Sequence, residues 1–121
     1  MAQFRYIVDD VDLSVAFCTR HLGFDLIEQF GPAMAILRKD DLDLWLAGPQ
    51  ASASKPMPDG CTPSPGGWNR IVVIMTDLNE TVQAMRKAGA NFRNDIVDGP
   101  GGKQILCNDP SGNVVEMFQP A

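Results

Sequence analysis

The order strand, helix, strand, strand, strand occurs twice in this chain of 121 residues. Alternation of apolar and polar residues over residues 3–8 predicts the first strand of one copy, and the apolar run over residues 70–75 predicts its counterpart. A unit of roughly 50 residues buries too little apolar surface to be stable alone. The repeat therefore predicts that two copies pack together, either within the chain or between two chains.

Each predicted first strand is followed by a helix with recognisable ends. Asp10 and Asp77 occupy equivalent places, where an aspartate side chain can accept a hydrogen bond from the first turn of a helix. Gly23 and Gly89 predict the ends of the two helices. Between these limits apolar residues recur at helical spacing: Val11, Val15, Cys18 and Leu22 in the first copy, and Leu78, Val82 and Met85 in the second.

Three short strands are predicted after each helix, because turn-forming residues separate the alternating segments. They are FDLIEQF (24–30), AMAILR (33–38) and LDLWLA (42–47) in the first copy, and NFRNDIV (91–97), KQILCN (103–108) and NVVEMF (113–118) in the second. We expect a single domain with module 1 at about residues 1–47 and module 2 at about residues 68–121. Residues 48–67 are rich in Pro, Gly and Ser and are interpreted as a linker, with a functional lid as the alternative.

Charge and cysteine usage narrow the expected partners and location. The formal net charge of -5 predicts no nucleic-acid or anionic-membrane partner, because such surfaces need clustered Lys and Arg. We expect a cytoplasmic protein, since no leader pattern opens the chain and no apolar run is long enough to span a membrane. Cys18, Cys61 and Cys107 lie far apart without C-x-x-C spacing, which predicts free thiols in a reducing compartment.

The repeat and two segments give the chain a family resemblance. The segments are VDLSVAFCTRHLGF (11–24), after the first strand, and DPSGNVVEMF (109–118), near the end of the chain. Together they resemble the vicinal oxygen chelate superfamily, which includes glyoxalase I, bleomycin-resistance proteins, fosfomycin-resistance proteins and extradiol dioxygenases. The resemblance implies an α+β fold of two βαβββ modules, with curved mixed sheets forming a cup-shaped cavity. It also implies a homodimer, often with sites at a module interface.

The resemblance further implies a divalent metal site built from the first and last strands of the modules. Gln3, Asp43 and Glu116 match ligand positions, with Trp45 as the alternative to Asp43 if the register differs. Arg70 stands at the fourth position and departs from the pattern, because a guanidinium has only hydrogen-bond donors and cannot ligate a metal. We therefore expect no cofactor, and Mg²⁺, Mn²⁺, Ni²⁺ or Zn²⁺ is the alternative. The donor fork of Arg70 suits a carboxylate, and Glu116 is the nearest candidate.

Strand alternation predicts which side chains face the cavity. If Val115 and Met117 pack under a helix, their neighbours on the same strand point the other way. The predicted lining combines apolar walls with a few polar groups, as small-molecule sites do. It consists of Gln3, Arg5, Asp43, Trp45, Arg70, Val72, Val114, Glu116 and Phe118.

Several functions fit this lining. One hypothesis is a glyoxalase-like lyase or isomerase, or a dioxygenase-related enzyme, in which Glu116 is the general base and Arg70 clamps a carboxylate or enolate. The alternative is a sequestering protein like the bleomycin-resistance branch, which binds a cationic or aromatic small molecule without catalysis. A third is an interaction domain in which Arg70 and Glu116 merely neutralise each other. His21, on the first helix, is interpreted as a packing or solvent-exposed residue.

Overall fold

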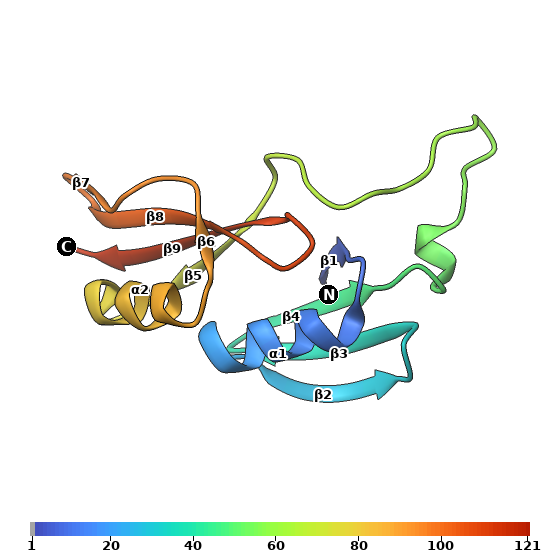
Figure 1. Ribbon diagram of the computed structural model, residues 1–121, viewed down its shortest axis with the longest axis horizontal. Coiled ribbons are helices and arrows are strands. Elements are labelled where there is room, and N and C mark those ends of the chain that lie inside the picture. The colour runs from blue at the N-terminus through green and yellow to red at the C-terminus, as the bar shows by residue number, and fades with distance from the viewer. Residues whose placement is uncertain (1) are drawn as a thin grey trace.

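The computed structural model describes residues 2–121 as two βαβββ modules joined by a long connection (Figure 1). The α+β class and the repeated element order predicted from the sequence are confirmed. The elements of module 1 are β1 (Phe4–Ile7), α1 (Val11–His21), β2 (Asp25–Phe30), β3 (Met34–Lys39) and β4 (Leu42–Ala47). A 3₁₀ helix, η1 (Ser52–Ser54), lies in the connection. The elements of module 2 are β5 (Ile71–Ile74), α2 (Leu78–Lys87), β6 (Asn91–Phe92), β7 (Val97–Gly99), β8 (Gly102–Asn108) and β9 (Val114–Pro120).

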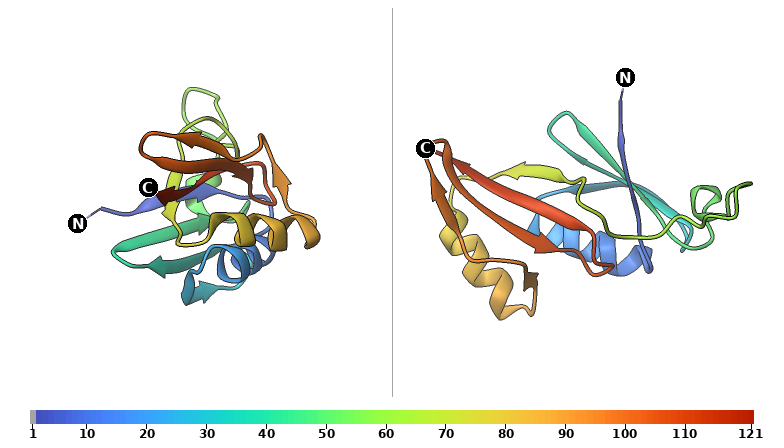
Figure 2. Two further views of the ribbon diagram at one scale, coloured as in Figure 1. Left: turned by 90° about the vertical axis from the view of Figure 1, so that its left-hand side faces the viewer. Right: turned by 90° about the horizontal axis from the view of Figure 1, so that it is seen from above.

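Each module forms one mixed sheet. Sheet A has the strand order β1-β4-β3-β2, and sheet B has the order β5-β9-β8-β6, with β7 also paired to β8. In both sheets the first strand runs parallel to the last, and the remaining pairs are antiparallel. The two sheets stay separate and do not close into a barrel. Figure 2 (right) shows that α1 and α2 lie on the same side of the two sheets.

The helices begin and end where the sequence predicts. Asp10 accepts a hydrogen bond from Leu13 N at 3.0 Å, and Asp77 accepts one from Glu80 N at 3.2 Å. Gly23 has a φ of 76°, a left-handed conformation that other residues adopt only with strain, and it allows the chain to leave α1. Neither helix formed by residues 2–121 is long and apolar enough to cross a membrane.

The two modules pack against each other within one chain, which answers a question that the sequence left open. Tyr6 on β1 reaches module 2, where its hydroxyl donates to Val114 O at 2.6 Å and accepts from Ile71 N at 3.0 Å. A second contact between the modules comes from Asn113, which precedes β9 and donates from Nδ2 to Ile7 O at 2.8 Å. Buried apolar residues of both modules form one core cluster on the helix side of the sheets. Burial raises the pKa of Tyr6 to about 12.

One segment differs from its predicted structure, and the connection between the modules makes defined contacts at its start. The single strand expected over residues 91–97 is divided into β6 and β7, because Leu106 N donates to the side chain of Asn94 at 2.9 Å rather than to a strand carbonyl. The connection that follows β4 is held by hydrogen bonds at its start. Ser54 Oγ donates to Gly48 O at 2.7 Å, and Gly48 N donates to Ala33 O at 2.8 Å, so this stretch is tied to the end of sheet A.

Candidate functional site

Arg70 and Glu116 form an ion pair on sheet B, as their chemistry predicts. Arg70 directly precedes β5, and Glu116 lies in the middle of the neighbouring β9. Arg70 Nε and Nη2 donate to Glu116 Oε1 at 3.1 and 2.9 Å. The side chains are 31% and 13% exposed, so the pair lies at the surface but is partly shielded from water. Arg70 Nη1 makes a longer contact, 3.4 Å, with Trp68 O.

Both strong contacts from Arg70 go to the same oxygen of Glu116. Among residues 2–121, no hydrogen bond reaches the second oxygen, Oε2. A carboxylate can accept on both oxygens, so Oε2 is available to a donor from outside the chain. One oxygen of the Glu116 carboxylate is therefore hydrogen-bonded, and the other has no partner among residues 2–121.

Apolar side chains surround this pair on the face of sheet B that points away from α2, which we call the outward face. Val72 and Ile74 on β5 are 49% and 55% exposed there, whereas the alternate residues Ile71 and Val73 are buried. Leu106 on β8 lies opposite Glu116. A pocket of about 350 Å³ beside β5 is lined by these two exposed residues together with Phe24, Leu42 and the β3–β4 turn. This pocket combines apolar residues with the charged side chains Lys39, Asp40 and Asp41, and neither Arg70 nor Glu116 is part of its lining.

The outward face of sheet A carries a different set of side chains. Arg38 and Asp43 form an ion pair, with Nε–Oδ1 at 2.7 Å and Nη2–Oδ2 at 3.2 Å. This contact, by a hydrogen bond first and by charge second, raises the pKa of Arg38, and it lowers the pKa of Asp43. Arg5 instead lies over the ring of Trp45, with its Cζ 5.0 Å from the ring centroid.

Register decides between Asp43 and Trp45 as the counterpart of Glu116. Because Asp10 and Asp77 cap equivalent helices, Arg5 and Val72 are equivalent residues of the two first strands. Their partners on the last strands are Trp45 and Glu116. Trp45 therefore occupies the carboxylate position in module 1, which was the alternative left open by the sequence.

These positions do not fit a divalent metal ion. Of the four equivalent places, Gln3 and Glu116 offer oxygen lone pairs, whereas Trp45 and Arg70 offer only donors. Asp43 is held by Arg38, and Glu116 is held by Arg70, so each carboxylate already faces a positive charge. Within residues 2–121 no group of three His, Cys, Asp or Glu side chains has the arrangement of a metal site.

The predicted lining residues fall into two groups in the structure. Gln3 and Asp43 share a pocket of about 280 Å³ on sheet A, whereas Glu116 lies on sheet B. No outward residue of sheet B lines the pocket of Gln3 and Asp43. Phe118 is half-buried beside Glu116, and Val114 is 1% exposed, so Val114 adds no surface to the face. Ile74 and Leu106 also lie on this face by strand alternation, although the predicted lining did not include them.

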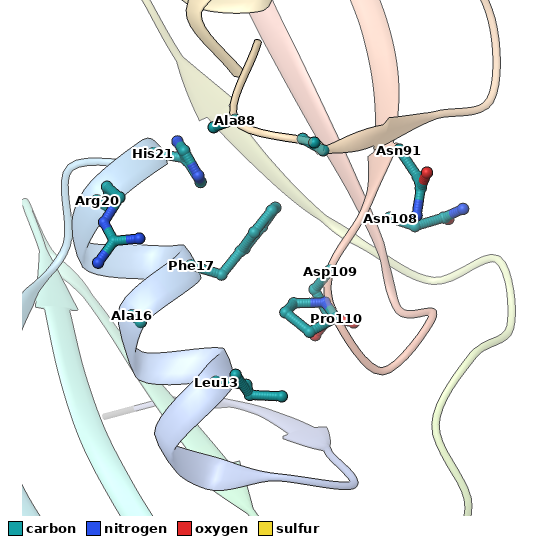
Figure 3. Close-up of a pocket in the computed structure, with 12 residues that line it drawn as sticks. Leu13, Ala16, Phe17, Arg20, His21, Ala88, Asn91, Asn108, Asp109 and Pro110 are labelled. Atoms are coloured by element: carbon teal, nitrogen blue, oxygen red, sulfur yellow. The ribbon is translucent and has the colours of Figure 1, made fainter. Parts of the chain in front are cut away.

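A separate pocket of about 310 Å³ lies between α1 and module 2 (Figure 3). Phe17 projects into it, with His21 packed against the Phe17 ring at 5.4 Å between centroids. Burial, with a smaller effect of Arg20, lowers the pKa of His21. Asp109 on the opposite wall accepts hydrogen bonds within its own turn, including one from Asn113 N at 2.8 Å. The contact with Phe17 agrees with the packing interpretation of His21, whereas Asn108 Oδ1, also in this lining, is buried without a hydrogen-bond partner among residues 2–121.

Comparisons with known proteins agree with the fold. The sequence model of the Glyoxalase/Bleomycin resistance protein/Dioxygenase superfamily matches residues 1–117. No curated protein sequence matches the chain. Three similar solved structures match nearly the whole of this chain and of their own chains.

Lactoylglutathione lyase from Agrobacterium tumefaciens is 18% identical, with a TM-score of 0.73 over 98% of this chain and 92% of that chain. The fosfomycin resistance protein FosX from Listeria monocytogenes is 14% identical, with a TM-score of 0.74 over 100% and 93%. TnmS3, an antibiotic binding protein from Streptomyces sp. CB03234, is 21% identical, with a TM-score of 0.68 over 100% and 97%. At these identities the likeness concerns the fold.

Proposed function

The chain belongs to the glyoxalase/bleomycin resistance protein/dioxygenase superfamily, and from this premise we propose that it binds a small organic molecule at the Arg70–Glu116 pair without a divalent metal ion. The observation that carries the proposal is the free Oε2 of Glu116 beside exposed apolar residues of β5. A metal-dependent site would need lone pairs at the positions of Trp45 and Arg70, which have none to offer.

The geometry indicates what the ligand must present. Glu116 Oε2 accepts a hydrogen bond, so the ligand needs a hydroxyl, amide or ammonium donor. Arg70 Nη1 makes only a 3.4 Å contact with Trp68 O, so its N–H groups are available to an oxygen of the ligand. Val72 and Ile74 supply an apolar floor for the rest of the molecule. The ion pair itself is neutral overall, so this site favours a polar neutral or zwitterionic group.

A second candidate is a metal-free lyase or isomerase at the same place. Glu116 has the free oxygen that a general base needs, and Arg70 could stabilise negative charge that develops on a substrate oxygen. Structures similar in fold include both a lactoylglutathione lyase and an antibiotic binding protein, so this fold accommodates catalysis and sequestration. Turnover of a bound ligand that Glu116→Gln abolishes even when the ligand is saturating would favour the enzyme over the binding protein.

We further propose that a second copy of the chain completes the cavity as a homodimer. Val72 and Ile74 are large apolar residues left about half exposed on the outward face of sheet B, and a second copy of the chain would cover them. Sedimentation should show a dimer, and Ile74→Glu should shift it to monomer. The matched control is Leu13→Glu, at a residue 57% exposed on the helix side, which should leave the dimer intact. A monomeric wild type would overturn this arrangement.

Ligand binding itself can be tested by screening small alcohols, amides and acids against ¹⁵N-labelled protein. Hits should shift backbone amides of residues 70–74 and 114–118. Arg70→Met and Glu116→Gln should each weaken these hits about tenfold or more, because one charge-assisted hydrogen bond is lost. Shifts confined to other regions, or equal affinity in both variants, would refute the site.

A further inference from the structure

Arg5 is an unpaired cation on the outward face of sheet A. The three ion pairs formed by residues 2–121 join Arg38 to Asp43, Arg70 to Glu116, and Arg86 to Asp95, so Arg5 takes part in none. Its guanidinium rests on the ring of Trp45, which screens one side from water and leaves the donors at its rim free. A positive charge therefore stands on this face without an internal partner.

Arg5 also lines a pocket of about 270 Å³, which we call the Arg5 pocket. Arg5 is the only charged residue in its lining. The floor and walls are mainly apolar, and two polar side chains come from the connection that follows β4. The residues used in the argument are Arg5, Phe30, Met34, Ala47, Gln50 and Ser52.

The wall contributed by the connection is fixed in place by backbone contacts. Ser54 Oγ and Ala51 N both donate to Gly48 O, at 2.7 and 3.0 Å. Gly48 itself packs so closely that a Cβ would lie 2.7 Å from Val11 Cγ2. Because its loop is already ordered, the Arg5 pocket needs little rearrangement to receive a ligand.

We propose that the Arg5 pocket binds a small organic anion with an aromatic or other apolar body. The guanidinium fork matches a carboxylate or a similar oxyanion, and no carboxylate in the lining competes for it. Phe30, which is 50% exposed, and Met34 offer apolar contact to the body of the ligand. Gln50 and Ser52 can donate or accept hydrogen bonds at the rim. The inference uses none of the residues of the Arg70–Glu116 site, so either can fail without the other.

The test compares two probes that differ in charge but scarcely in shape, benzoate and benzamide. Each is titrated into ¹⁵N-labelled protein at constant ionic strength while the Trp45 indole and the backbone amides of residues 48–54 are followed. Benzoate should shift these signals and bind about tenfold more tightly than benzamide, as expected for one charge-assisted contact. Equal affinity for the two probes, or no shift at these signals with benzoate, would overturn the proposal.

Two variants sharpen the test. Arg5→Gln should reduce benzoate affinity about tenfold and leave benzamide unchanged, because only the charge-assisted contact is removed. Arg38→Gln is the matched control, since it removes a cation from the same face that is already paired with Asp43. It should leave benzoate binding intact, and an equal loss in both variants would mean that general charge attraction is responsible. Benzoate shifts confined to residues 70–74 and 114–118 would refute the Arg5 pocket and leave the Arg70–Glu116 site standing.

Discussion

In module 1 the last strand carries Trp45 opposite Arg5, whereas the same position in module 2 carries Glu116 opposite Val72. Both modules place an arginine near this position, but one arginine stacks on an indole and the other reaches a carboxylate. The backbone plan is shared, including the parallel pairing of first and last strands. The difference shows that the helix-facing side of each sheet maintains the fold, while the outward side is free to diverge in chemistry.

The shared plan predicts that equivalent core residues matter equally. Leu46 and Met117 follow Trp45 and Glu116 on the last strands, and each is 0% exposed. Truncation of either to Ala should lower the free energy of unfolding by about 2–5 kcal/mol, because buried apolar contacts are lost and a cavity remains. Urea denaturation measures both. A loss in one variant with almost none in the other would break the equivalence of the two modules.

The next largest expected effect on stability comes from Tyr6, whose counterpart in module 2 is the apolar Val73. Tyr6→Phe leaves a buried amide and carbonyl of module 2 without their partner, which should cost about 1–3 kcal/mol of unfolding free energy. Equal stability of wild type and variant in urea would show that this hydroxyl does not join the modules.

The same hydroxyl predicts a pH dependence. Burial raises the pKa of Tyr6 from 10.0 to about 12, so the folded state holds this proton more tightly than the unfolded state. Its contribution to stability is complete below pH 10 and is lost as the pH rises through about 12. Wild type should therefore lose stability more steeply than Tyr6→Phe over this window. Parallel curves would contradict the assignment.

Removal of the arginine from each outward face should change the stability of the protein by different amounts. Arg70→Met leaves the 13% exposed side chain of Glu116 without its partner and should lower the free energy of unfolding by about 1–3 kcal/mol. Arg5→Met removes an exposed cation without an ion-pair partner and should change stability by less than about 0.5 kcal/mol. Chemical denaturation measures the free energy of unfolding of both variants. Similar losses in the two would mean that the ion pair of Arg70 does not stabilise the protein more than the unpaired Arg5 does.

The smallest expected effect concerns His21, whose counterpart at the end of α2 is Ala88. Because the folded-state pKa of His21 lies below 6.5, the folded protein binds this proton more weakly than the unfolded chain. The contribution of neutral His21 to stability is therefore complete above pH 6.5 and is lost as the pH falls through the folded-state pKa. An NMR titration should give a midpoint below 6.5, and Arg20→Gln should raise it slightly. A midpoint above 6.5 would contradict the burial of the ring.

Much of this plan could be predicted from the sequence because its signals are local. The caps at Asp10 and Asp77 need only the first turn of each helix, and the contact of Arg70 with Glu116 follows from charge and strand alternation. The counterpart of Glu116 could not be predicted, because choosing Trp45 over Asp43 requires the register between strands that lie far apart in sequence.

Side-chain contacts with the backbone account for the other differences. The division into β6 and β7 depends on the Asn94 side chain, which accepts the hydrogen bond from Leu106 N in place of a strand carbonyl. The alternation of apolar and polar residues does not predict this contact. The Arg5 pocket depends on a loop tied back by Ser54 to Gly48, within a stretch whose composition resembles a linker. In both cases a single polar side chain, rather than a pattern, determines the local structure.

The most direct test of the central claim is calorimetric titration of Mn²⁺, Ni²⁺ and Zn²⁺ into chelator-treated protein, with Glu116→Gln as the control. Our account assigns Glu116 to Arg70 and an organic ligand, so it predicts no stoichiometric binding that depends on Glu116. One ion bound per chain in wild type, and lost in Glu116→Gln, would contradict it.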